Sequence, residues 1–267
     1  MYRVLATPRW LGLAVLAMLL AATMVRLGGW QLHRYHERSA VNARIDASAT
    51  ADPVALAAVV PPPGTAGRAG PPPPPAAAWT RVRVTGQYDT SREILVRNRT
   101  VEGVVGFEVL TPLVLADGSA LLVDRGWLRA PPGGATAVPQ VPPPPSGQVS
   151  VVGPVRLPES RADPAVRRGD HLEVRRIDPA RAAPALPYPL YGAYVILDTQ
   201  EPPGAAGLRS IPPEHQDALQ NAGYVVQWWL LAALTLVGFG YLARREAAHR
   251  EAAHREAQRL AEPAAAG

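Results

Sequence analysis

Two long apolar runs stand near the ends of the chain and enclose a region in which apolar and polar positions alternate. The first run covers residues 10–29 and the second covers residues 224–242. Each has about the twenty residues that a helix needs to cross the hydrocarbon core of a bilayer. Both therefore predict transmembrane helices, with residues 1–9 before the first and a charged, helix-prone tail at 243–267 after the second.

The first apolar run has two interpretations. Arg3 and Arg9 precede it, as basic residues precede the apolar part of a cleavable signal peptide. No small-x-small cleavage site follows, however, and the apolar sequence continues past Arg26. An uncleaved signal anchor is therefore the favoured interpretation, and residues 30–60 predict a helical extension of it.

The charges beside the second run predict its orientation. Arg244 and Arg245 follow it, whereas Glu214 and Asp217 precede it. Because arginine is enriched on the cytoplasmic side of membrane helices, the C-terminus is expected in the cytoplasm. With two spans the N-terminus lies there too. The sequence thus predicts a multi-pass plasma membrane protein whose main domain is extracytoplasmic.

Period-two alternation between the spans predicts strands. The clearest runs are residues 81–88, 92–99, 106–115, 119–128, 149–157 and 191–199, while 171–178 is ambiguous. A Pro-rich linker at 61–78 precedes them, and a Pro-rich loop at 131–147 interrupts the domain at 79–223. The predicted fold class is a membrane protein with two transmembrane α-helices flanking a mostly antiparallel β (α+β) extracytoplasmic domain.

Composition excludes several functions. The formal net charge is +5, but the arginines that carry it are scattered, which argues against a nucleic-acid partner. The chain has no cysteine, and its three methionines lie near the N-terminus. An outer domain without sulfur ligands is a poor Cu(I) carrier, so a copper chaperone is disfavoured.

No catalytic motif of the hydrolase, metalloprotease or P-loop kind occurs, so we expect no catalytic residues and no enzyme activity. An extracytoplasmic hydrolase remains an alternative. His33 and His36 share one face of the expected helix and are conceivable as a metal or haem site, although interfacial polar side chains are the favoured interpretation. We therefore expect no metal site.

The arginines of the alternating runs form the candidate binding chemistry. Alternation places Leu95, Arg97 and Arg99 on one side of a strand, and Val123, Arg125 and Trp127 on one side of another. Guanidinium groups beside a tryptophan suit the carboxylates of an amphipathic ligand. The favoured alternative is a solvated sheet face or an internal pair, for example with Asp124.

Three segments resemble the surfeit locus protein 1 family. They are LGGWQLHRYHER (27–38), the stretch from GQYDTSREILVRNR through TPL to LLVDRGWLRA (86–130), and YVVQWW (224–229). Order and spacing both agree with the family pattern, and R-G-W after L-V-D is the most specific part. The resemblance covers both spans and the central core.

The resemblance implies an assembly factor for haem-copper cytochrome c oxidase, which assists subunit I around haem a insertion and is not catalytic. It implies subunit I, and the haem a synthesis machinery, as partners. No permanent cofactor is expected, but haem a is a candidate transient one. The implied haem contacts are His215, Arg97, Arg99, Arg125 and Trp127. The implied partner contacts are Trp30, Gln31, Arg34, Tyr224, Gln227, Trp228 and Trp229.

One position departs from the family. Family members often carry a histidine three residues before the aromatic that opens the last span, and here Asn221 stands there. Asparagine is a poor haem ligand, so His215 becomes the candidate axial ligand. The competing hypothesis for the whole protein is a general membrane-anchored scaffold or sensor that binds another envelope protein through its outer β domain.

Overall fold

The computed structural model describes residues 7–132, 137–169, 171–213 and 215–261. The chain divides into a helical unit, made of residues 1–42 and 215–267, and a sheet domain, made of residues 43–214. Parts of three expected segments lie outside the described residues, namely the N-terminal segment, the Pro-rich loop and the tail.

The helical unit contains α3 (Ala218–Ala261) and α1 (Pro8–Thr50) as far as Asn42, while the last part of α1 belongs to the sheet domain. Both are long and apolar enough to cross a membrane, as judged by length and composition. The expected spans at 10–29 and 224–242 lie within them, so the prediction of two long apolar helices is confirmed. α3 also continues through the described part of the tail.

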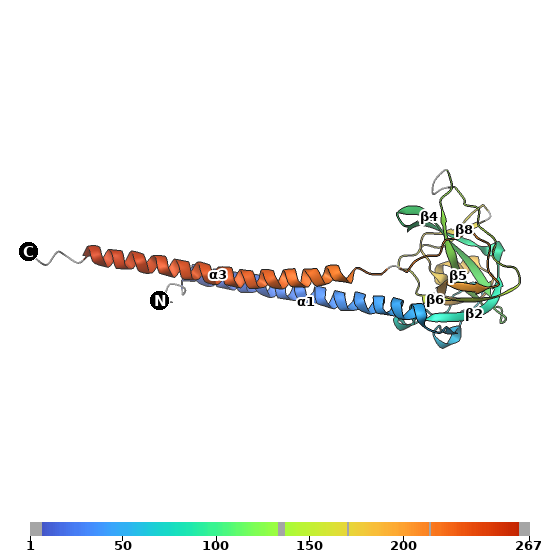
Figure 1. Cartoon of the computed structure of the whole chain (residues 1–267), viewed down its shortest axis with the longest axis horizontal. Helices are drawn as coiled ribbons and strands as arrows, with labels where there is room; N and C mark the ends of the chain where they lie inside the picture. The colour runs from blue at the N-terminus through green and yellow to red at the C-terminus, as the bar shows by residue number, and fades with distance from the viewer. Residues whose placement is uncertain (1–6, 133–136, 170, 214, 262–267) are drawn as a thin grey trace, which may run out of the picture. The chain divides into compact units, whose positions relative to one another are not determined.

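α1 and α3 run antiparallel and side by side in the helical unit (Figure 1). Residues with increasing numbers on α1 contact residues with decreasing numbers on α3, as antiparallel helices require. In order along α1, these contacts are Trp10–Phe239, Met24–Thr235, Gly28–Trp229 and Gln31–Asn221. The contacts at 24, 28 and 31 recur at the three- and four-residue spacing that keeps one helix face against a partner.

The helical extension ends at Thr50, before the expected end at residue 60. Pro53 explains this, because proline lacks the N–H donor that a helix needs and disfavours helical backbone in the residue before it. The chain then forms the two-residue strand β1 (Val54–Ala55), which pairs in parallel with β2, and a short 3-10 helix at Leu56–Ala58.

The sheet domain contains a mixed sheet of ten strands in the described part of the chain. The strand order is β1-β2-β6-β9-β5-β4-β3-β8-β7, with β10 paired to β6. The bounds are β2 (Arg81–Tyr88), β3 (Ile94–Val101), β4 (Val104–Val114), β5 (Ala120–Arg129), β6 (Gln148–Arg156), β7 (Val166–Arg168), β8 (His171–Val174), β9 (Leu190–Ile196) and β10 (Thr199–Glu201). Because β2 also pairs with β4, strands β2, β6, β9, β5 and β4 close into a small barrel.

The strand predictions are largely confirmed. β2 has the expected bounds, and its even-numbered residues from Val82 to Tyr88 are buried while its odd-numbered residues are not. The ambiguous run at 171–178 is a strand only as far as Val174. The run at 191–199 is divided between β9 and β10. Most pairs are antiparallel, but β1–β2, β3–β8 and β5–β9 are parallel, which makes the sheet mixed.

Apolar clusters lie on both faces of this sheet. The barrel interior is filled by side chains of β2, β4, β5, β6 and β9, including Val84, Leu113, Val123 and Val195. The outer face of β3, β4, β5 and β9 is covered by the helix α2 (Pro179–Ala182), the 3-10 helix Ala183–Ala185 and the residues that flank them. Polar side chains can contact each other only when they lie on the same face of the sheet.

The range that we expected as a Pro-rich linker, 61–78, packs in part against β9. The backbone N–H groups of Gly64 and Gly70 donate to the carbonyl of Leu190 at 3.0 and 2.8 Å, and Leu190 N–H donates to Arg68 at 3.2 Å. A 3-10 helix at Pro75–Ala77 follows. These backbone hydrogen bonds make this segment part of the domain.

Candidate functional site

A bulge in β3 separates the first pair of predicted arginines. Strand alternation predicted that Leu95, Arg97 and Arg99 share one side. The pairing of β3 with β4 instead shifts register between Arg97 and Arg99, and Asn98 between them has a φ of 59°. An extra residue turns every following side chain to the other face. The prediction is therefore wrong for Arg99.

The partners of the two arginines show the same separation. Arg97 Nη1 contacts Glu173 Oε2 at 3.1 Å. Arg99 contacts Glu108 Oε2 at 2.8 Å and Glu159 Oε1 at 2.6 Å. Glu173 and Glu108 stand opposite two adjacent residues of β3, whose side chains face opposite sides of the sheet. Both arginines are thus paired, but on different faces.

A second bulge, in β5, separates Arg125 from Trp127. The Trp127–Glu108 pair is followed by the Asp124–Leu110 pair. These two pairs are three residues apart on β5 but only two apart on β4, so β5 has one extra residue between them. Gly126 takes up the extra residue with a φ of 135°, a conformation that favours glycine. Val123 and Arg125 face the barrel interior, whereas Trp127 stands on the outer face beside Glu108. The prediction of one shared side is wrong for Trp127.

The outer face therefore carries a cluster centred on Arg99. Trp127 is buried, and its indole Nε1 donates to the carbonyl of Arg99 at 3.0 Å. Glu108 and Glu159 pair with the Arg99 guanidinium, and buried Asp124 accepts a backbone hydrogen bond from Gly126 at 3.2 Å. Three carboxyl groups thus surround one arginine. Burial and the charge of Glu108 raise the pKa of Asp124 well above its ordinary value.

Asp124 predicts a pH effect with a definite sign. Its pKa is raised in the folded protein, so the unfolded chain loses this proton at lower pH. The free energy of unfolding therefore falls as pH rises from the ordinary aspartate pKa of about 3.9 towards the folded value. Asp124→Asn is expected to remove this contribution and to raise the free energy of unfolding at pH 7. Urea titrations of both proteins at pH 5 and pH 8 measure the free energy of unfolding and its change with pH.

The exposed Asp52→Asn is the control, because it makes the same chemical change without removing a buried charge. A loss of stability at pH 8 in Asp124→Asn would show instead that the ionised carboxylate contributes to the fold.

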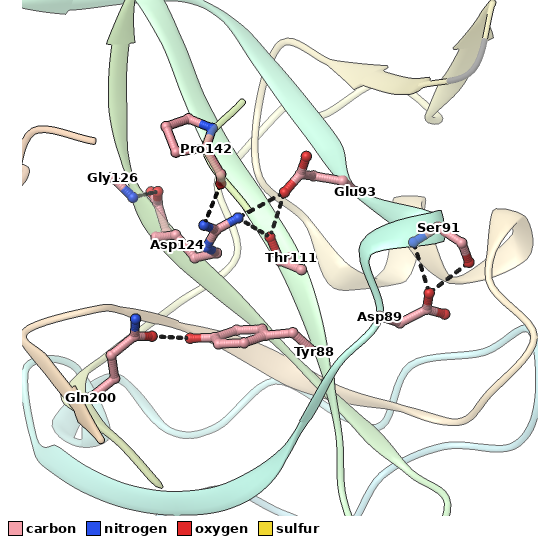
Figure 2. A network of polar contacts seen from close by, with 10 residues as sticks. Tyr88, Asp89, Ser91, Glu93, Thr111, Asp124, Gly126, Pro142 and Gln200 are labelled. Atoms are coloured by element: carbon pink, nitrogen blue, oxygen red, sulfur yellow. Dashed lines mark hydrogen bonds and ion pairs between the residues drawn. The ribbon is translucent and has the colours of Figure 1, made fainter. Parts of the chain in front are cut away.

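Arg125 forms a separate cluster on the interior face. Its guanidinium donates to Glu93 Oε1 at 2.9 Å, to Thr111 Oγ1 at 3.4 Å and to the carbonyl of Pro142 at 2.7 Å (Figure 2). It also lies 5.7 Å from the ring centroid of Tyr88. The internal-pair interpretation thus holds for Arg125. Its partner is Glu93, not the Asp124 given as an example, because the latter faces the other side.

A polar cluster also lies on the seam of the helical unit. Asn221 is buried, and its Nδ2 donates to Gln31 Oε1 at 2.6 Å. Arg38 donates from Nη1 to Asn221 Oδ1 at 2.9 Å and to the carbonyl of Asp217 at 2.9 Å. One turn further along α1, Asn42 exchanges two hydrogen bonds with the backbone of Gln216, both at 2.8 Å.

The other predicted partner residues have different surroundings. Trp30, Tyr224 and Gln227 are exposed, and Trp228 is half-buried. Trp229 packs its indole on Gly28. Arg34 pairs with Glu37 of its own helix at 2.9 Å. Of this set, Gln31 and Trp229 form hydrogen bonds across the seam.

The residues predicted to hold haem do not share one surface of the sheet domain. His215 belongs to the helical unit, whereas the three arginines and Trp127 belong to the sheet domain and are divided between its two faces. Asn221, at the family histidine position, uses its amide to join Gln31 and Arg38. An asparagine whose amide is engaged in this way does not fit an axial haem ligand. The described residues also hold no cluster of three or more His, Cys, Asp or Glu suited to a metal ion.

A pocket of about 220 Å³ opens elsewhere in the sheet domain. Its apolar wall includes Trp79, Ile196 and Leu197, and its polar groups include the ion pair of Arg81 with Asp198. None of the predicted haem-contact residues is among its described lining residues. The pocket therefore gives no support to the predicted haem contacts.

Sequence reasoning missed the partners of the arginines. Glu93, Glu108, Glu159 and Glu173 are single acidic residues on separate segments, and no local pattern joins them to Arg97, Arg99 or Arg125. Their pairing depends on which strands become neighbours. Arg38 lies in the quoted motif at 27–38, so the motif itself was the signal available for it.

The fold and these clusters define a protein with two antiparallel apolar helices and a small mixed β-barrel domain in which Arg97, Arg99 and Arg125 are paired with glutamates. The SURF1 family model matches residues 18–233, and the chain belongs to the SURF1 family. Uncharacterized SURF1-like proteins of Mycobacterium tuberculosis and Mycobacterium bovis are each 33% identical over 246 residues, covering 91% of this chain and 86% of the relative. A SURF1-like protein of Monosiga brevicollis is 29% identical over 245 residues, covering 82% of this chain and 83% of the relative.

Proposed function

We propose that this protein is a membrane-anchored, non-catalytic assembly factor for haem-copper cytochrome c oxidase. In this proposal it assists the biogenesis of subunit I around haem a insertion. The observation that carries the proposal is membership of the SURF1 family across both apolar helices and the sheet domain. The family is generally linked to assembly of this oxidase.

The proposed location is the plasma membrane, with both termini in the cytoplasm and the sheet domain outside. Two helices of sufficient length and apolar composition support the membrane part. Arg244 and Arg245, at the end of the apolar part of α3, support the orientation. The aromatic residues Trp30, Tyr224, Trp228 and Trp229 suit a membrane–water interface.

The proposal includes haem a only as a transient contact. The predicted arginines are occupied by glutamates, and Asn221 joins the two helices, so this chain's residues support no permanent haem at those positions. Subunit I and the haem a synthesis machinery are the proposed partners. The exposed side chains of the helical unit, led by Trp30 and Tyr224, are the proposed contact surface.

Deletion of the gene is the test. We expect the haem a absorbance of isolated membranes to fall several-fold, while succinate dehydrogenase activity stays unchanged. Normal oxidase spectra in the deletion strain would contradict the proposal. Loss of several unrelated membrane enzymes together would favour the general scaffold or sensor instead.

Co-purification tests the contact surface. A tagged Trp30→Ala, Tyr224→Ala double variant is expected to recover about tenfold less subunit I than the unmodified chain, because interface aromatics often contribute 2 kcal/mol or more. The control is Tyr241→Ala, an exposed aromatic farther along α3. Equal recovery from both variants would place the contact elsewhere without affecting the assembly role.

A further inference from the structure

A second pocket of the sheet domain lies beside β3, β7 and β8 and has a volume of about 310 Å³. It is lined by three arginines, two acidic residues and a few apolar side chains. The charged lining residues are Arg97, Arg168, Arg175, Asp163 and Glu173. Nothing in the proposed function uses this pocket.

One buried carboxylate organises two of the arginines. Glu173 is 7% exposed, and its Oε2 accepts from Arg97 Nη1 at 3.1 Å and from Arg168 Nε at 2.8 Å. A buried carboxylate needs one cationic partner to balance its charge, and here it has two. Because a guanidinium carries five N–H donors in a planar fork, the shared glutamate also limits the rotation of both groups.

The described lining residues of the pocket include more arginines than acidic groups. Three arginines face two acidic residues, and the third arginine, Arg175, is exposed. Three further exposed arginines lie near the pocket in sequence, at Arg161, Arg167 and Arg176. A concave site with net positive charge and neighbouring cations raises the local concentration of anions.

The pocket also lies next to the end of the sheet. β7 is the last strand in the described strand order, and all three of its residues are exposed. The exposed side chain of Val166, which lines the pocket, marks a route by which an anionic group can approach from solvent. The described lining residues thus combine access from solvent, a guanidinium held in place by Glu173 at Arg168, and a second, exposed guanidinium at Arg175.

We propose that this pocket binds a carboxylate or phosphate group through Arg168 and Arg175, with Arg97 held behind them by Glu173. Guanidinium groups bind such oxyanions by paired, charge-assisted hydrogen bonds. The group belongs either to a small free anion or to an acidic side chain of a protein. The inference does not rest on the proposed function, and either can fail while the other holds.

Isothermal titration calorimetry of the full chain in detergent tests the proposal. The probes are pyrophosphate, citrate and a synthetic tetraglutamate peptide. The Arg168→Gln, Arg175→Gln double variant is expected to bind the preferred probe about tenfold more weakly, since charge-assisted bonds are the strong ones. The matched control is Arg167→Gln with Arg176→Gln, which removes the same charge from neighbouring residues that do not line the pocket.

The control pair is expected to weaken binding by about twofold or less, in keeping with screened surface charge. Preference for citrate or pyrophosphate identifies a small anion as the ligand, and preference for tetraglutamate identifies an acidic segment. Equal weakening in both double variants, or no binding of any probe by the unmodified chain, overturns the proposal. If the pocket double variant unfolds, the Arg175→Gln single variant is used in its place, because it leaves the contacts of Glu173 with Arg97 and Arg168 unchanged. The same loss of probe binding is then expected.

Discussion

Replacing Arg125 with Gln is expected to lower the free energy of unfolding of the sheet domain by about 3 kcal/mol or more. Arg125 is 5% exposed and donates to Glu93, Thr111 and the carbonyl of Pro142. The substitution leaves the Glu93 carboxylate without its cation and the Pro142 carbonyl without its charged donor. Hydrogen exchange of the β4 and β5 amides measures the effect, because it reports the stability of these strands separately from the helices.

The matched control is Arg209→Gln. Arg209 also pairs with a glutamate in the sheet domain, Glu102, at 3.4 Å, but the two side chains are 57% and 71% exposed. Solvent-exposed pairs of this kind contribute about 1 kcal/mol or less. If both variants lose the same small amount of free energy of unfolding, the Arg125–Glu93 pair is solvated, and the expected large loss is wrong.

Replacing Gly28 with Leu is expected to force α1 and α3 apart. A Cβ atom at Gly28 falls 2.3 Å from Nε1 of Trp229, well inside contact distance. The indole must then leave its position, where Nε1 lies 3.4 Å from the carbonyl of Val25. Overpacking of this kind costs about 1 to 3 kcal/mol, and about 1.4 kcal/mol within that range already corresponds to a tenfold smaller ratio of closed to open helix pairs.

The absence of native cysteine makes cross-linking a direct measurement. Met24→Cys with Thr235→Cys places two thiols across the seam, where the native Sδ and Oγ1 atoms are 3.8 Å apart. A short thiol-reactive cross-linker is expected to join them in the parent chain and about tenfold less in the Gly28→Leu background.

Gly29→Leu is the control for helix propensity and added volume. Gly29 is the next residue of the same helix, and a Cβ there meets nothing within 4 Å. Its cross-linking yield is expected to match the parent chain. Equal losses in both variants would show that the added leucine disturbs the helix and not the seam.

The elements were predictable because their signals are local. The apolar run at 224–242 and the alternation of 81–88 each repeat with the period of the structure that they form. The end of α1 was not predicted, although Pro53 gave a local reason for it. The parallel pairing of β3 with β8 had no local signal, since pairing depends on residues far apart in the chain.

The candidate site was predicted only as a set of residue types. Alternation assumes a strand without interruption, and the bulges at Asn98 and Gly126 break that assumption beside the arginines that mattered. Asn221 was noted as a departure from the family, but its hydrogen bonds to Gln31 and Arg38 required the packed helices.

The sequence by itself determined the two apolar helices, most of the strands and the family, because each of these depends on residues that are neighbours along the chain or form one motif. Only the tertiary structure decided that Arg99 and Trp127 share the outer face, that Arg125 lies inside with Glu93, and that two arginines share Glu173. Strand register and helix contact set these pairings. Both depend on the closed barrel and on the packed helix pair, where segments distant in sequence become neighbours. In a strand, a single extra residue also turns the following side chains to the other face.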